Sequence, residues 1–214
     1  MSPSVTIDEV VLADEPERWS ALGFALDRDR LRLGAVSLRL AGEGAGRGIV
    51  GWSLRGIATN ELDGLATEQS NSTPPAPAAD HPNGIVGLDH LVAMTPALDR
   101  TVPALQEAGL DLRRIREEPT PAGAPRQAFF RLGAEILEVV QEPEHIVAER
   151  EGDQRRPMRL WGLALLTADL DQTVATLGKH AGEPRAAVQP ERRIATVKRS
   201  AGLAVPVALM SQKP

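Results

Sequence analysis

The sequence contains no cysteine and no tyrosine among its 214 residues, and aromatic side chains make up only 3% of it. The absence of cysteine excludes disulfides, thiolate metal sites and cysteine nucleophiles, so any metal would need histidine and carboxylate ligands. Only four histidines are available for that purpose. The scarcity of aromatic rings also leaves few groups on which a planar ligand could stack.

Long apolar runs and a secretion signal are missing as well. No stretch approaches the roughly 18 apolar residues that span a bilayer, and the opening MSPSVTIDEV has neither a basic nor an apolar region. We therefore expect a cytoplasmic protein without a membrane partner. The net charge of −5 argues against nucleic acid as a partner, because phosphate binding needs a clustered basic surface.

The sequence does contain an internal repeat. Residues 87–110 have the pattern of a strand followed by a helix, with Asp99 expected as the N-cap and Pro103 in the first helical turn. Shifting this stretch by 72 positions gives seven identities in fifteen positions. The identical residues are Leu91, Thr95, Leu98, Asp99, Thr101, Val102 and Leu105. This agreement indicates a repeated strand–helix unit.

Three segments share one predicted order of elements, in which a strand, a helix and three further strands follow one another (βαβββ). We expect the first segment at 1–57, the second at 85–142 and the third at 158–214. The stretch 58–84 is rich in Ser, Thr, Asn, Pro and Ala, which predicts a linker without helix or strand. Residues 143–157 are predicted to form a charged connector.

A glycine-rich turn in the first segment matches the sequence pattern of a nucleotide-binding motif. Gly46, Gly48 and Gly51 match the pattern G-x-G-x-x-G, which binds pyrophosphate only where it leads from a strand into a helix. The residues that follow, VGWSLRG, have the character of a strand. We therefore predict a hairpin turn here and no nucleotide site.

The second segment carries the residues that connect this chain to a known group of proteins. LDHLVAMTPALDRTV begins at Leu88, and FFRLGAEILEVV begins at Phe129. Together with tandem βαβββ units, these motifs resemble the vicinal oxygen chelate superfamily, which includes glyoxalase I, extradiol dioxygenases, methylmalonyl-CoA epimerase and bleomycin-binding proteins. The resemblance implies a glyoxalase-like α+β fold, in which βαβββ units pair into a curved, half-open barrel with the helices outside.

The resemblance also implies a metal held by the first and fourth strands of two paired units. His90 and Glu138 occupy these positions in the second segment, whereas Gly162 and Ala208 occupy them in the third and offer no ligand. Glu9 falls at the matching position of the first segment. If the first and second segments pair, Glu9, His90 and Glu138 supply three ligands for Fe, Mn, Ni, Zn or Co. Otherwise His90 and Glu138 hydrogen-bond to each other in a metal-free site.

Further candidates for substrate binding lie near these two residues. Gln127, Phe129 and Arg131 share one side of the third strand of the second segment, and the sequence leaves open whether that side faces the site. Trp161 either lines the rim of the site or packs in the core. Glu138 is the candidate for catalytic proton transfer.

Several functions stay open at this point. One is a metal-dependent lyase or isomerase, or a dioxygenase-like enzyme, that acts on a small oxygenated molecule. The alternative is a metal-free small-molecule binding protein of the bleomycin-resistance type, and a purely structural or dimerising module is also open. Lys and Arg outnumber Asp and Glu after Met158, which indicates either a solvated surface or an anionic ligand. We also expect a homodimer, with the second and third segments paired inside each chain.

Overall fold

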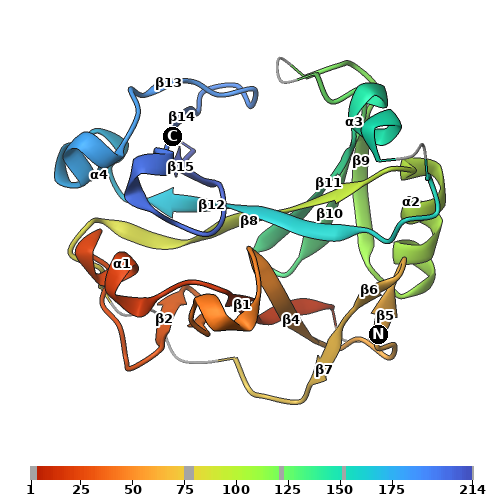
Figure 1. The fold of residues 1–214 in the computed structure, drawn as a ribbon, viewed down its shortest axis with the longest axis horizontal. Coiled ribbons are helices and arrows are strands. Elements are labelled where there is room, and N and C mark those ends of the chain that lie inside the picture. Colours follow the sequence, from red (N-terminus) through yellow and green to blue (C-terminus); the bar gives the residue numbers. More distant parts are fainter. Residues whose placement is uncertain (1–3, 75–79, 121–122, 151–152, 214) are drawn as a thin grey trace. The chain divides into compact units, whose positions relative to one another are not determined.

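The computed structural model describes residues 4–74, 80–120, 123–150 and 153–213. The chain forms mixed, open sheets with few helices, which is an α+β fold (Figure 1). None of the helices in the described part of the chain has the length and apolar character needed to cross a bilayer. Two compact units interleave along the sequence. Unit 1 is Met1–Ile7, Ser53–Asn71 and His90–Trp161, and unit 2 is Asp8–Trp52, Ser72–Asp89 and Gly162–Pro214.

The second segment has the predicted order of one strand, one helix and three strands. Its elements are β8 (Ile85–Thr95), α2 (Leu98–Glu107), β9 (Asp111–Arg116), β10 (Gln127–Leu132) and β11 (Glu135–Gln141). Within unit 1, β8 pairs in parallel with β11, β11 pairs antiparallel with β10, and β10 pairs antiparallel with β9. The first and fourth strands of the segment are therefore neighbours (Figure 1).

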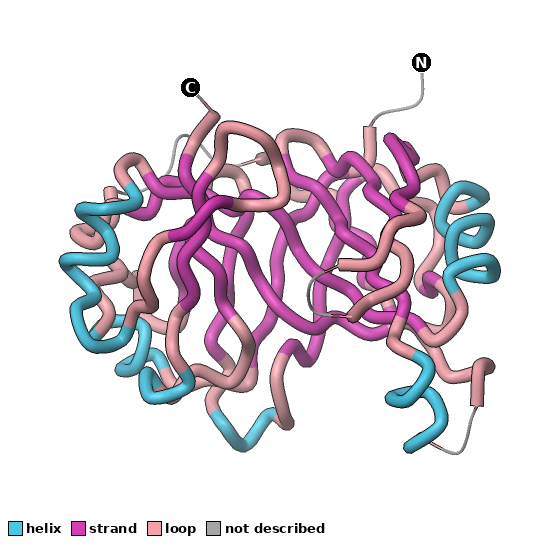
Figure 2. The backbone as a smooth tube through the Cα atoms, turned by 90° about the horizontal axis from the view of Figure 1, so that it is seen from above, coloured by secondary structure: helices cyan, strands magenta, loops and turns pink. Residues whose placement is uncertain are grey.

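One face of this sheet belongs to the core. Alternate residues of β8 after His90, and of β10 and β11, are buried, and the fully buried ones include Leu91, Ala93, Ala128, Phe130, Leu137 and Val139. Helix α2 contacts β9, β10 and β11 and buries Leu98, Val102 and Leu105, and Figure 2 shows the helices on the outer side of the strands. Because successive strand residues point to opposite faces, the remaining residues of β8, β10 and β11 line the other face.

The start of α2 differs from the prediction. The N-cap is Ala97 and not Asp99, which lies inside the first turn and pairs with Arg126 (Nη1–Oδ1 2.7 Å). The helix begins earlier because the hydroxyl of Thr95 accepts the N–H of Ala97 at 3.2 Å, directly where β8 ends. Pro103 consequently lies in the helix interior and not in the first turn, on an exposed side where water can satisfy the carbonyl that loses its partner.

The third segment repeats this topology. Its elements are β12 (Arg159–Thr167), α4 (Leu170–Leu177), η2 (Gly178–His180), β13 (Arg185–Ala186), β14 (Arg193–Thr196), η3 (Arg199–Ala201) and β15 (Val207–Ser211). Within unit 2, β12 pairs in parallel with β15, which pairs antiparallel with β14, and β14 pairs antiparallel with β13. Asp169 is the N-cap of α4, because its side chain accepts the N–H of Gln172 at 3.0 Å. The internal repeat of the sequence is thus also a repeat of strand order.

The first segment has the predicted order of elements but a different pairing. Its elements are β1 (Thr6–Leu12), α1 (Pro16–Ala21), β2 (Arg30–Leu33), β3 (Val36–Leu40), η1 (Glu43–Ala45) and β4 (Ile49–Arg55). Within unit 2, β1 pairs in parallel with β3 and β3 pairs antiparallel with β2, whereas β4 follows on the other side of β1. The glycine-rich connection therefore crosses β1, and the predicted hairpin is wrong. A strand does follow the glycines, as predicted.

Regular elements also lie in the stretches expected to be a linker and a connector. Residues 58–84 contain β5 (Glu61–Leu62), β6 (Leu65–Ala66) and β7 (Glu68–Ser70), and residues 143–157 contain α3 (Glu144–Glu149). Within unit 1, β5 and β6 form an antiparallel pair, and β7 pairs in parallel with β4. The strands precede Pro74, while Pro75 and Pro77 lie outside the described residues. The strands β4, β5, β6 and β7 thus resemble the second segment in one respect, because their first strand, β4, pairs in parallel with their last strand, β7. They differ from it because, in this described part of the chain, no helix lies between β4 and β7.

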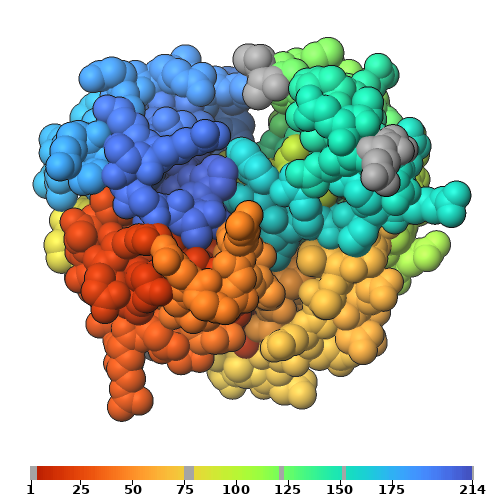
Figure 3. Space-filling view, viewed as in Figure 1, coloured from red at the N-terminus to blue at the C-terminus, as the bar shows by residue number. Residues whose placement is uncertain are grey.

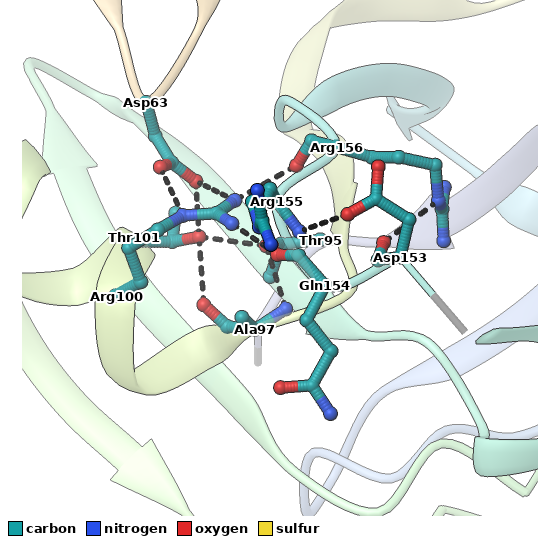
Figure 4. A network of polar contacts seen from close by, with 9 residues as sticks. All are labelled: Asp63, Thr95, Ala97, Arg100, Thr101, Asp153, Gln154, Arg155 and Arg156. Atoms are coloured by element: carbon teal, nitrogen blue, oxygen red, sulfur yellow. Dashed lines mark hydrogen bonds and ion pairs between the residues drawn. The ribbon is translucent and has the colours of Figure 1, made fainter. Parts of the chain in front are cut away.

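A polar network in unit 1 joins the β5–β6 hairpin to the beginning of α2 (Figure 4). Arg100 donates two hydrogen bonds to the carboxylate of Asp63, with Nε–Oδ1 at 2.6 Å and Nη2–Oδ2 at 2.9 Å. Arg100 also donates to the carbonyl of Arg156 at 2.8 Å. Thr101 donates to Asp63 and lies 2.7 Å from the hydroxyl of Thr95, so the network reaches the end of β8.

The same hairpin packs closely against the segment that precedes β12. The N–H of Met158 donates to the carbonyl of Asp63 at 3.0 Å. Gly64 has a positive φ of 79°, and a Cβ at this position would lie 2.6 Å from the Cβ of Pro157. Figure 3 shows the two segments side by side, in gold and teal. Only glycine fits this turn without displacing its neighbour.

Candidate functional site

His90 and Glu138 lie together on the open face of the unit 1 sheet. Nε2 of His90 is 3.3 Å from Oε2 of Glu138, which confirms the prediction that these two side chains come within reach of each other. In the parallel register, Ile136 is the residue opposite His90, and Glu138 is opposite Val92. The two side chains are only 12% and 15% exposed, so both are largely removed from water.

The surroundings of Glu138 alter its protonation. Burial raises the pKa of Glu138, and this effect exceeds the opposite effect of His90 and of the hydrogen bond from Gln127. Arg114 and Arg116 also act to lower the pKa of this carboxyl group. A carboxyl group with a raised pKa exchanges its proton nearer to neutral pH, which suits it to proton transfer.

The third strand faces the site with Gln127, Phe129 and Arg131. Phe129 is directly opposite Glu138 in the antiparallel pairing of β10 with β11, and directly paired residues share a face. The question that the sequence left open is therefore decided in favour of the odd-numbered residues of β10. Nε2 of Gln127 donates to Oε1 of Glu138. Gln127 is 7% exposed, and its Oε1 atom is buried without a hydrogen-bond partner among the described residues.

Two arginines of β9 complete this face, and the sequence analysis missed both. Arg114 is opposite Phe129, with the guanidinium carbon 4.6 Å from the ring centroid. Arg116 is opposite Gln127. The run of basic residues in DLRRIR was a signal in the sequence, but only the pairing of β9 with β10 places these side chains beside the site.

The other predicted substrate-binding residues, Arg131 and Trp161, are exposed. Arg131 is exposed, and its Nη1 donates to the carbonyl of Gly133 at 3.4 Å. Its partner across β11 is Ile136, the same residue that lies opposite His90 on β8. Trp161 on β12 is 42% exposed, so it does not pack in the core. The roles assigned to these residues stay predictions.

Comparison with solved structures identifies the fold of this chain. No protein-family model matches the sequence, and a search of curated proteins finds no relative. The crystal structure of methylmalonyl-CoA epimerase from Mycobacterium tuberculosis matches with a TM-score of 0.51 and 18% identity, over 64% of this chain and 94% of that one. A xylose isomerase-like TIM barrel/4-hydroxyphenylpyruvate dioxygenase fusion protein matches with a TM-score of 0.63 and 13% identity. That match covers 99% of this chain and 50% of the fusion protein.

Both neighbours are members of the vicinal oxygen chelate superfamily. The chain has the vicinal oxygen chelate fold. Within this fold, the first and fourth strands of a βαβββ unit lie side by side, as β8 and β11 do here. The resemblance noticed in the second segment is therefore confirmed at the level of the fold.

The donor set does not fit the divalent metal that the vicinal oxygen chelate fold implies. Among the described residues, no group of three or more His, Asp or Glu side chains could hold a metal ion. His90 and Glu138 are two ligands, whereas a metal site normally has three or four from the protein. Glu9 accepts hydrogen bonds from Arg30 and Arg39 at 3.1 and 3.0 Å within unit 2. Its addition to the ligand set stays a prediction.

A steric reason closes the equivalent position of the third segment to ligands. The register of β12 with β15 supports the alignment of Ala208 with Glu138. Gly162 occupies the position of His90, and a Cβ there would lie 2.9 Å from the carbonyl oxygen of Pro206. A histidine at this position would have to push β12 away from β15. The third segment therefore has no counterpart of His90 or Glu138.

The remaining histidines lie elsewhere, and one of them, His81, is buried. His81 is 6% exposed, with Nδ1 accepting the N–H of Ala25 at 3.1 Å. Nε2 of His81 is 2.8 Å from the carbonyl of Arg32 and donates to it, because Nδ1 is the acceptor. His81 thus connects two parts of unit 2, while His145 is exposed.

Proposed function

We propose that this protein binds a small anionic or oxygenated molecule on the open face of β8, β11 and β10, and that it does so without a resident metal. The observation that carries this proposal is the pair of His90 and Glu138, held at 3.3 Å on a face that is neither core nor fully solvated. Buried carboxyl groups with a perturbed pKa, such as Glu138, are concentrated at functional sites.

The rest of the face supports an anionic or oxygenated ligand. Phe129 offers an apolar surface between the polar groups, and Arg114 above its ring contributes positive charge. Gln127 and His90 add groups that form hydrogen bonds to oxygen atoms. The metal-free binding protein is favoured over the metal-dependent enzyme because His90 and Glu138 contact each other directly and lack a third ligand among the described residues.

A second candidate function is that of a lyase or isomerase in which Glu138 moves a proton. The raised pKa of Glu138 favours this function, because a carboxyl group removed from water takes up and releases a proton closer to neutral pH. Oε2 of Glu138 would accept the proton from the bound molecule, and His90 would hold that oxygen in place. Gln127 would keep the other carboxylate oxygen oriented.

Nuclear magnetic resonance of labelled protein tests the binding proposal. Acetate, succinate, pyruvate and catechol serve as probes, and we expect at least one of them to shift the imidazole signals of His90 and the side-chain amide of Gln127. His90→Ala should weaken that binding about tenfold, because it removes a hydrogen bond to the ligand. Arg113→Ala is the matched control, since Arg113 is exposed and pairs with Asp111 at 3.1 Å.

Two outcomes would contradict the proposal. One is the absence of shifts at His90 and Gln127 with all four probes. The other is binding that Arg113→Ala weakens as much as His90→Ala does, because this would place the ligand elsewhere on the surface. Turnover measurements on the wild-type protein and on Glu138→Gln separate the two candidate functions. A binding protein binds the ligand without converting it in either form. A lyase or isomerase converts the ligand in the wild-type form and loses this activity in Glu138→Gln.

A further inference from the structure

The amide of Gln127 has one atom that the described chain leaves unsatisfied. Gln127 is 7% exposed, and its Nε2 donates to Oε1 of Glu138. Its Oε1 is buried and has no hydrogen-bond partner among the described residues. A buried acceptor without a donor is unfavourable and uncommon in folded proteins. The site therefore lacks one hydrogen-bond donor.

The neighbours of Gln127 do not supply that donor among the described residues. A carboxylate only accepts hydrogen bonds, so Glu138 takes the N–H of the amide and leaves Oε1 turned away from it. Nε2 of His90 lies 3.3 Å from the other oxygen of Glu138. Arg116 is opposite Gln127 on β9, but its Nε lies 3.6 Å from the carboxylate of Glu118. None of these side chains donates a hydrogen bond to Oε1 of Gln127 among the described residues.

Positive charge lies within a short distance of this acceptor. Residues directly opposite each other in an antiparallel pair have Cβ atoms about 5 Å apart, and diagonal neighbours are about 7–8 Å apart. Arg116 is the direct neighbour of Gln127 and Arg114 is the diagonal one. A molecule with a backbone of a few carbon atoms can therefore contact the amide oxygen and a guanidinium group at the same time.

Resting on the function proposed above, we propose that the molecule bound here is a small hydroxy acid. Its hydroxyl group donates to Oε1 of Gln127, and its carboxylate pairs with the guanidinium group of Arg114 or Arg116. Gln127 is then a specificity-determining residue. It selects a hydroxy acid over the corresponding acid without the hydroxyl group, because the latter leaves the buried acceptor unpaired.

Matched pairs of acids test this inference. Glycolate with acetate, L-lactate with propionate, and L-malate with succinate are titrated against the full chain, and the His90 imidazole and Gln127 amide signals report binding. We expect a hydroxy acid to bind about tenfold more tightly than its partner in at least one pair. Gln127→Met removes the acceptor at similar length, and it should reduce the affinity for the hydroxy acid to that for its partner. Arg113→Ala should leave the preference unchanged.

The outcomes separate this inference from the function on which it rests. Two results would contradict the hydroxy acid as the ligand but would leave the proposed binding function intact. One is equal affinity within all three pairs, and the other is binding of only pyruvate or catechol at His90. No shift at His90 with any probe overturns both. A preference that persists in Gln127→Met overturns the role of Gln127. If Gln127→Met does not fold, the preference of the wild-type protein and the shift of its Gln127 amide decide the question.

Discussion

His90 lies opposite Ile136 in the register of β8 with β11, yet its side chain contacts Glu138, two residues further along β11. An offset of two residues keeps both side chains on one face, because alternate strand residues point the same way. Gln127 holds the second oxygen of Glu138 from the neighbouring strand β10. The carboxylate is therefore fixed from both sides, by β8 and by β10.

The first prediction concerns Glu138 and pH. Burial raises the pKa of Glu138, so the folded protein holds this proton more tightly than the unfolded chain. The stability from this group is fully present below the unfolded pKa and is lost as the pH rises through the folded pKa. Glu138→Gln, which is neutral at every pH, should melt at a higher temperature than the wild-type protein at pH 8. Its advantage should shrink at pH 4.

Circular dichroism at the two pH values measures this effect. Glu118→Gln is the control, because the Glu118 side chain is 77% exposed and should change the melting temperature little. A melting temperature of Glu138→Gln below that of the wild-type protein at pH 8 would show that the hydrogen bonds of the carboxylate outweigh its desolvation.

The second prediction concerns Glu142, whose side chain is 1% exposed. Burial by itself raises the pKa of Glu142, but Arg156 and Arg159, at 2.6 and 3.2 Å from its oxygens, outweigh burial and lower the pKa. The resulting stability is present above the unfolded pKa and is lost as the pH falls through the folded pKa. Glu142→Gln should cost about 1.5 kcal/mol at pH 7, because it removes the carboxylate that pairs with two partly exposed arginines.

Urea denaturation at pH 7 and at pH 3 tests this prediction, and the cost should be smaller at pH 3. Asp111→Asn is the control, since its pair with Arg113 is exposed and should contribute less than about 1 kcal/mol. An equal loss of stability in the two variants would contradict a special role for Glu142.

The third prediction concerns metal. His90 and Glu138 are only two ligands, and no group of three lies among the described residues. We therefore expect protein purified without a histidine tag to carry no stoichiometric Fe, Mn, Ni, Zn or Co, and expect none to stay bound after loading and dialysis. Elemental analysis measures this. One equivalent of metal that His90→Ala abolishes would overturn the metal-free site and restore the ligand set with Glu9.

The fourth prediction compares two glycines of unit 1 that both have positive φ. A Cβ at Gly64 would lie 2.6 Å from Pro157, whereas a Cβ at Gly109 would meet no atom within 4 Å. Gly109→Ala should cost about 1 kcal/mol for the backbone conformation alone. Gly64→Ala should cost at least about 1 kcal/mol more, because the hairpin must move. Equal costs in urea denaturation would show that the hairpin shifts freely.

The fifth prediction is the homodimer expected from the sequence. Large apolar side chains are exposed at Trp161 and Val188, at 42% and 60%. A second chain that covers Trp161 would remove this large apolar side chain from water. Light scattering should give twice the mass of one chain at micromolar concentration, and Trp161→Ser should lower the fraction of dimer. A monomer at every concentration would remove this prediction.

The repeat in the sequence was sufficient to establish the order of elements. The second and third segments have the same strand order, and the repeated residues Asp99 and Asp171 both pair with an arginine at the start of the third strand of their segment. Those arginines are Arg126 and Arg193. The strand–helix pattern depends on periodicity and spacing along a short piece of chain, so it can be recognised locally, whereas the two ion pairs were found only in the folded chain. The proximity of His90 and Glu138 was also predicted, from the family resemblance and the alternation of strand residues.

Other features depended on which strands pair and in which register. The pairing of β10 with β11 determines on which face of the sheet Gln127 lies, and the pairing of β10 with β9 determines the position of Arg114. The position of β4 on the far side of β1 from β3, and the close approach of Pro206 to Gly162, likewise depend on residues that are far apart along the chain. The local sequence of a strand is compatible with either face and with several neighbours, because its alternation repeats every two residues. Only long-range hydrogen bonding and packing in the folded chain select among these arrangements.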